Sequence, residues 1–127
     1  MVKKLYPLCE NHLFSKAYRK GKSIANKYVA VYVLKNYGDK RKNNVPSAKL
    51  GITVNKKLGK ATQRSRVKRI IRAAYRMIMP DLKNGYIIIV AARTAVFDKK
   101  VKSTDVCKQM YKSFEKLGVI SDNGGAN

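Results

Sequence analysis

The chain has 127 residues, of which 45% are hydrophobic, so its composition excludes a disordered basic tail. Its length predicts a single domain with a core over residues 1–120 and a disordered C-terminal tail at 121–127. Lys and Arg number 29 against 7 Asp and Glu, which gives a net charge of +22. This charge predicts a polyanionic partner, either nucleic acid or an anionic membrane surface.

The predicted elements of the first half are one helix and two strands. Residues 11–21 predict a short helix, and residues 27–35 and 48–56 predict strands because β-branched and aromatic residues alternate there with other types. The polar residues 36–47 lie between the two strands. We expect them to form a loop that joins the strands as an antiparallel hairpin.

The second half predicts a helix, a strand and a helix. Residues 61–79 have helical periodicity that ends at Pro80, and residues 84–92 combine a turn with an almost continuous apolar run. Such a run is typical of a central strand, and residues 103–117 predict a final amphipathic helix. The order α-β-β-α-β-α favours an α+β fold, a single-domain α-β sandwich in which helices cover a mixed sheet of three or four strands.

The helix at 61–79 combines an apolar stripe with dense positive charge. Between Lys40 and Pro80 there are 13 Lys and Arg residues and no acid. At 100° per residue, the stripe consists of Val67, Ile70, Ile71, Ala74 and Ile78. The opposite face holds Ser65, Lys68, Arg69, Arg72 and Arg76, and Arg64 and Arg66 flank the stripe. A packed helix holds cations at fixed spacing, which suits phosphate contacts, although an ordinary solvated face is the alternative.

Aromatic residues predict a second feature on the strand at 27–35. Its valines alternate with Ala30 and Tyr32, so these two side chains share the other face of the sheet. Phe14 and Tyr18 lie on one face of the first helix and could wall a shallow trough there. Aromatic side chains with a cationic rim suit single-stranded nucleic acid. The alternative is that these aromatics are core residues, which is favoured for Phe14 and stays open for Tyr18 and Tyr32.

No catalytic constellation is evident in the sequence. The seven acids are not paired at a spacing typical of metal-assisted phosphodiester cleavage, and the single His12 has no evident partner. Cys9 and Cys107 are too far apart for a paired zinc motif, so we expect reduced thiols in a cytoplasmic protein. No apolar run is long enough for a membrane-spanning helix or a signal peptide. The residues alone predict binding of RNA or DNA without catalytic side chains.

Three segments resemble the bacterial ribonuclease P protein family, and the resemblance extends from about Leu8 to Leu117. They are "LFSKAYRKGKSIANKYVAVYVL" at 13–34, "KKLGKATQRSRVKRIIRAAYR" at 56–76 and "YIIIVAAR" at 86–93. The second segment is the most specific, since it resembles the basic signature helix of the family with its preceding Lys-rich loop. It departs at one position, because Ser65 stands where the family has Asn between two arginines.

The resemblance implies a function and a topology. The family's protein joins a catalytic RNA that removes the 5′ leader from precursor tRNA with bound Mg²⁺. The protein then serves as a subunit of an endoribonuclease, and Mg²⁺ is held mainly by the RNA. The family also implies a left-handed crossover through strand 48–54, helix 61–79 and strand 86–91, whereas pattern alone predicts the usual right-handed form.

The resemblance further implies two groups of site residues. The 5′ leader of precursor tRNA is expected in a cleft lined by Phe14, Tyr18, Ala30, Tyr32 and Thr53. The other RNA-binding residues are Lys56, Lys57, Lys60, Arg64, Ser65, Arg66, Lys68, Arg69, Arg72 and Arg76. No catalytic residue is predicted, and no protein residue is assigned to a metal. The alternatives are a ribosomal or other structural RNA-binding protein and a membrane-active or DNA-compacting basic protein.

Overall fold

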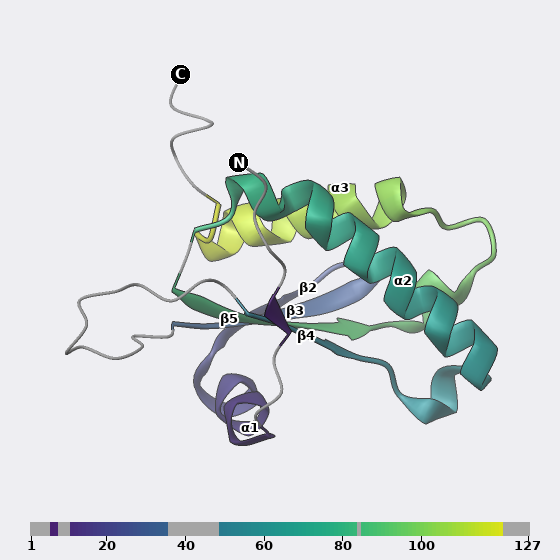
Figure 1. Ribbon diagram of the computed structural model, residues 1–127, viewed down its shortest axis with the longest axis horizontal. Helices are drawn as coiled ribbons and strands as arrows, with labels where there is room; N and C mark the ends of the chain where they lie inside the picture. The colour runs from purple at the N-terminus through teal and green to yellow at the C-terminus, as the bar shows by residue number, and fades with distance from the viewer. Residues whose placement is uncertain (1–5, 8–10, 36–48, 84, 121–127) are drawn as a thin grey trace.

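The computed structural model describes residues 6–7, 11–35, 49–83 and 85–120 (Figure 1). The predictions for Cys9, the loop at 36–47, Asn84 and the tail at 121–127 lie outside these residues. The helices are α1 (Asn11–Lys20), α2 (Ala61–Ile78) and α3 (Ser103–Leu117). The strands are β1 (Tyr6–Pro7), β2 (Lys22–Ala25), β3 (Val29–Lys35), β4 (Lys49–Thr53) and β5 (Tyr86–Ala92). Short 3-10 helices are η2 (Lys56–Leu58), η3 (Met79–Asp81) and η4 (Thr94–Phe97).

One mixed sheet, in the order β1-β4-β5-β3-β2, forms the middle layer of the molecule. Helices α2 and α3 cover one face and α1 lies against the other, as Figure 1 shows. The α+β sandwich predicted from the sequence is therefore confirmed. Four strands have four or more residues, and the two-residue strand β1 extends the sheet beside β4.

The predicted hairpin between the strands at 27–35 and 48–56 is wrong. Strand β5 lies between them, pairing antiparallel with β3 and parallel with β4. The physical reason is the composition of β5, in which Ile87, Ile88, Ile89 and Val90 are all buried. Such a strand is apolar on both faces. It is therefore most stable in the middle of the sheet, where both faces are covered and both edges are paired with other strands.

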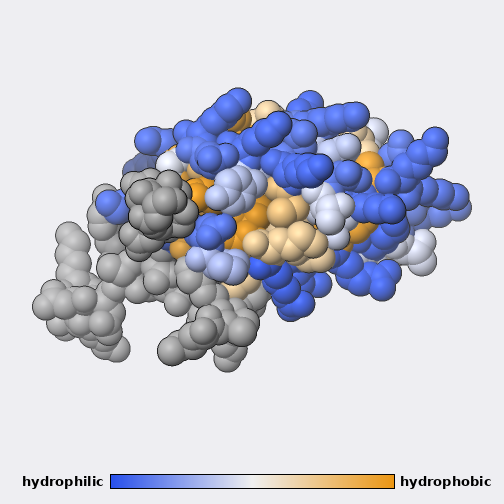
Figure 2. All heavy atoms as spheres, turned by 90° about the horizontal axis from the view of Figure 1, so that it is seen from above, coloured by the Kyte–Doolittle hydropathy of each residue, from blue (hydrophilic) through white to orange (hydrophobic). Residues whose placement is uncertain are grey.

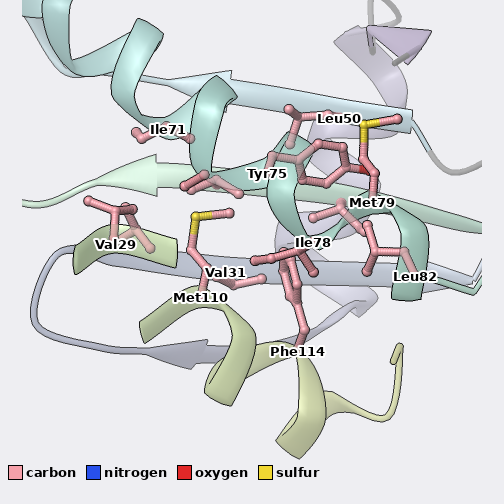
Figure 3. Packing of buried hydrophobic residues seen from close by; sticks show 14 of the residues in the cluster. Val29, Val31, Leu50, Ile71, Tyr75, Ile78, Met79, Leu82, Met110 and Phe114 are labelled. Atoms are coloured by element: carbon pink, nitrogen blue, oxygen red, sulfur yellow. The ribbon is translucent and has the colours of Figure 1, made fainter. Parts of the chain in front are cut away.

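The unit β4-α2-β5 forms the parallel crossover that the resemblance implies. Both strands run in the same direction and α2 connects them across one face of the sheet. In Figure 3, α2 lies in front of the sheet, and the two strands stand in the left-handed arrangement. The pattern-based expectation of a right-handed crossover is therefore wrong for this fold.

The main core fills the space between the sheet and helices α2 and α3 (Figure 3). Four of the five predicted stripe residues of α2 are buried, but Ile70 is only partly buried. Tyr75 is buried instead and packs edge-to-face against Phe114, with 6.4 Å between ring centroids. Burial raises the pKa of Tyr75, so its phenol stays neutral.

A smaller apolar cluster attaches α1 to the other face of the sheet. Ala17, Ile87 and Ile89 are its buried members, and Phe14 packs against them. Gly21 allows the close approach that follows α1, because a Cβ there would lie 2.5 Å from the Ala17 carbonyl oxygen and 2.7 Å from that of Val33.

Within the described residues, no helix has both the length and the apolar character needed to cross a membrane.

Candidate RNA-binding interface

The basic surface begins at the N-terminal end of α2. The backbone N–H of Lys60 donates to Gln63 Oε1 at 2.8 Å, and Ala61 starts the helix. The first turn contains no acid, although helix N-termini normally favour acids because their free N–H groups carry partial positive charge. Lys56 and Lys57, in η2 just before this end, add further cations. The arrangement is unfavourable for an isolated helix and favourable for binding an anion.

Most predicted basic residues of this region point into solvent. We call the set the basic ridge: Lys56, Lys57, Lys60, Arg64, Ser65, Arg66, Lys68, Arg69, Arg72 and Arg76. Arg64, Arg66 and Arg72 are partly buried, and the other seven are exposed. Figure 2, which looks onto the side of the sheet covered by α2 and α3, shows hydrophilic side chains over much of this surface.

Two arginines of the basic ridge differ from the rest in their local contacts. Arg66 Nη2 donates to the carbonyl oxygens of Lys99, at 3.1 Å, and Val101, at 3.0 Å. Arg66 therefore ties α2 to the segment before α3 and has a structural role that the sequence did not reveal. Arg64 Nε is buried without a hydrogen-bond partner in the structure.

Tyr18 and Tyr32 meet on the α1 side of the sheet. Their ring centroids are 4.7 Å apart and the ring planes make an angle of 77°. The Tyr18 hydroxyl lies 3.4 Å from Thr53 Oγ1, a long hydrogen bond that joins α1 to the end of β4. Tyr18 is nonetheless 43% exposed, so part of its ring remains open to a ligand. We call Tyr18, Tyr32, Thr53 and Ala30 the aromatic patch.

Small side chains form the sheet surface beside the aromatic patch. Ala30 is paired with Ala91, and Ala91 is also paired with Thr53 on the opposite neighbouring strand. These three residues therefore form a row across β3, β5 and β4, and all three are partly buried. Ala91 was not among the predicted site residues. Ala91 could have been found from its spacing along β5. It follows the buried Ile87 and Ile89 at intervals of two residues, and residues two apart in a strand lie on the same face.

Phe14, in contrast, contributes mainly to packing. It is partly buried against Ala17, Ile87 and Ile89, as the core alternative predicted. The structure thus brings four of the five predicted cleft residues together around Tyr18, and Phe14 supports the helix that carries Tyr18.

The aromatic patch and the basic ridge are neighbours. Thr53 is the last residue of β4, and Lys56 follows three residues later as the first residue of η2. Three residues of fully extended chain span at most about 11 Å, so the two Cα atoms lie within that distance. The geometry therefore combines an exposed aromatic ring, small neighbours and a cationic border, which suits a single strand of nucleic acid.

Ionisable groups that could support other chemistry are few in the described part of the chain. There, no group of three or more His, Cys, Asp and Glu side chains is placed to hold a metal ion. Burial raises the pKa of the partly buried Cys107 thiol, which disfavours the reactive thiolate.

Comparisons with known proteins agree with the arrangement of these residues. Residues 2–118 match the profile of the family described as Ribonuclease P. The "Ribonuclease P protein component" of Clostridium acetobutylicum is 40% identical over 111 residues, which cover 87% of each chain. The protein of the same name from Clostridioides difficile is 43% identical over 93 residues, covering 72% of this chain and 75% of the relative.

Solved structures show the same relationship at the level of the fold. The Staphylococcus aureus RNase P protein aligns with a TM-score of 0.74 and 30% identity, covering 93% of this chain and all of that chain. The Thermotoga maritima RNase P protein aligns with a TM-score of 0.70 and 27% identity, covering 90% of this chain and 97% of that chain. The chain therefore belongs to the ribonuclease P protein family, the protein component of the endoribonuclease that matures the 5′ end of tRNA.

Proposed function

We propose that this protein binds the 5′ leader of precursor tRNA with the aromatic patch and the catalytic ribonuclease P RNA with the basic ridge. Family membership supports the partnership with the RNA. The observation that carries the leader assignment is the exposed Tyr18 ring, held against Tyr32 and Thr53 beside the first cations of η2. A structural RNA-binding protein, such as a ribosomal protein, is the alternative, and the comparisons do not favour it.

In this proposal each part of the interface has a separate physical role. The Tyr18 ring supplies a surface on which a leader base can stack, and Ala30 and Ala91 leave room for the strand beside it. Lys56 and Lys57 are positioned to contact phosphates of the same strand. The exposed cations of α2, including Lys68 and Arg69, supply phosphate contacts at a spacing set by the packed helix.

The protein contributes binding energy and orientation in this scheme, and the RNA partner contributes the chemistry. We propose that Mg²⁺ acts in the complete enzyme and is bound mainly by RNA. Neutralising phosphates with protein cations also lessens the repulsion between the two RNAs, which reduces the Mg²⁺ concentration they need. We place this function in the cytoplasm, since bacterial precursor tRNA is made there.

Reconstitution tests the proposed function. Purified protein is added to a bacterial ribonuclease P RNA with labelled precursor tRNA, at a low Mg²⁺ concentration where the RNA alone is inactive. We expect specific removal of the 5′ leader only when both components are present. Failure of the folded protein to restore cleavage would favour the structural alternative. Leader removal by the RNA-free protein would contradict the division of roles.

A further inference from the structure

A second basic site lies at the other end of the sheet. A cavity of about 470 Å³ opens there between the C-terminal end of α1, the start of β2 and β5, the end of β3 and the end of α3. We call it the lysine pocket. Its lining includes Lys16, Lys20, Lys22, Lys35, Tyr86 and Leu117.

The lysine pocket is separate from the aromatic patch. On α1, Lys16 and Lys20 are each two residues from Tyr18, which turns them about 200° away around the helix axis at 100° per residue. Along β5, Tyr86 begins the strand, whereas Ala91 beside the aromatic patch lies five residues further on, about 16 Å away. The two sites therefore flank α1 and cannot be occupied by the same nucleotide.

The electrostatics of the lysine pocket point to an anionic ligand. Its four lysines are exposed, and no acid is among the described residues that line it. Gathering the ammonium groups of Lys16, Lys20 and Lys22 around one cavity costs repulsion in the free protein, and a bound polyanion removes that cost. The partial negative charge at the C-terminal end of α1 favours cations there, but it is equivalent to only about half an elementary charge.

The apolar part of the lysine pocket adds a second feature of the ligand. Leu34, Tyr86 and Leu117 also line the pocket, and all three are partly buried. A simple inorganic anion gains nothing from such surfaces, whereas a nucleotide offers both a phosphate and a flat base. A second cavity, between β3 and the start of α3, is less suited to a phosphate. Asp98 and Asp105 line it together with its lysines, so the positive charge there is partly neutralised.

We propose that the lysine pocket is a second RNA-binding site, which takes single-stranded RNA with phosphates on the lysines and one base against Tyr86. The assignment rests on the RNA partnership of the family and is independent of the leader assignment for Tyr18. It gives the protein two single-strand contacts on opposite sides of α1. One RNA strand can then be held at two points, or two RNA segments can be brought together.

The test compares two charge-matched variants of the full chain. The pocket variant carries Lys16→Gln, Lys20→Gln and Lys22→Gln, and the control carries Lys99→Gln, Lys108→Gln and Lys112→Gln. All six lysines are exposed, so both variants are expected to fold, which circular dichroism checks. The probe is single-stranded hexauridylate, and the readouts are the amide NMR shifts of Gly21 and Leu34 and the dependence of affinity on salt.

We expect hexauridylate to shift the Gly21 and Leu34 amides in the wild type, in the control and in Tyr18→Ala, but not in the pocket variant. The log–log salt slope should fall by about 2 in the pocket variant, since each lost single-strand phosphate contact removes about 0.7. Equal titrations of pocket variant and control would overturn the proposal. Displacement of the RNA by polyglutamate at equal charge concentration would also overturn it, because the ligand class would then be acidic protein. Loss of the shifts in Tyr18→Ala would show one continuous site and contradict a separate pocket.

Discussion

The two faces of the sheet are covered very differently. On one face, α2 and α3 enclose a core in which Val29, Val31 and Phe114 are fully buried. On the other face, α1 covers a cluster that has three buried members among the described residues, and Tyr18 is 43% exposed at its edge. The comparison teaches that one face supplies most of the stability, which leaves the other free to present side chains to a ligand.

The dimensions of α1 explain this asymmetry. A ten-residue helix is about 15 Å long and about 10 Å wide with its side chains. A sheet of five strands is about 19 Å wide at a spacing of roughly 4.8 Å. One short helix is therefore too small to cover this face alone, and at the partly buried Ala30, Ala91 and Thr53 the sheet surface carries small residues. A polar or flexible ligand can approach there without displacing core side chains.

The largest expected effect comes from the well-covered face. Phe114→Ala removes a fully buried ring that contacts Tyr75, and it should lower the free energy of unfolding by about 3 to 5 kcal/mol. Urea denaturation monitored by circular dichroism measures this loss. A change below about 1 kcal/mol would show that the α2/α3 face does not carry the stability assigned to it.

An intermediate effect is expected within the basic ridge itself. Arg66→Ala breaks two hydrogen bonds to the segment before α3 and should destabilise the fold by about 1 kcal/mol, discounted for partial exposure. Lys68→Ala should leave stability unchanged within about 0.5 kcal/mol, because that side chain is exposed. Both should lower RNA affinity if both contact phosphate. Equal stability of the two folded variants would remove the structural role of Arg66.

A small effect on stability is also expected on the open face. Tyr18→Phe keeps the ring and loses only the long contact to Thr53, so unfolding free energy should change by less than about 1 kcal/mol. Thermal unfolding measures it beside the wild type. A larger loss would mean that Tyr18 is mainly a structural residue, and the distinction between the two faces would then weaken.

Sequence patterns predicted the elements whose periodicity is local. The amphipathic helix at 103–117 has the bounds of α3, and the apolar run at 86–92 is the central strand. The pairing of β3 with β4 was predicted wrongly. Strand order depends on the stability that a strand distant in the sequence, here β5, acquires when it is buried between two others, and local patterns do not report this. Strand β2 was missed since only Ile24 among its four residues is partly buried, which leaves a weak pattern.

The candidate site shows the same limit. Helical periodicity correctly predicted that Ser65, Lys68, Arg69 and Arg76 are exposed, but it included Ile70 in the stripe and omitted Tyr75. The reason is that α3 packs on one side of α2, where Phe114 meets Tyr75, and turns the buried face toward it. The bonds of Arg66 were not predictable either, because its acceptors are 33 and 35 residues away in the chain.

The most direct test of the central claim measures binding of leader-bearing precursor tRNA and of mature tRNA to the reconstituted enzyme. Tyr18→Ala removes the exposed ring of the aromatic patch, while Tyr18→Phe serves as the control that keeps it. One base stack is worth roughly 1 to 3 kcal/mol, so Tyr18→Ala should weaken precursor binding about 5- to 150-fold. Mature tRNA binding and assembly with the catalytic RNA should barely change, and Tyr18→Phe should resemble the wild type. Equal loss of precursor and mature tRNA by a folded Tyr18→Ala protein would contradict the assignment of the open face to the leader.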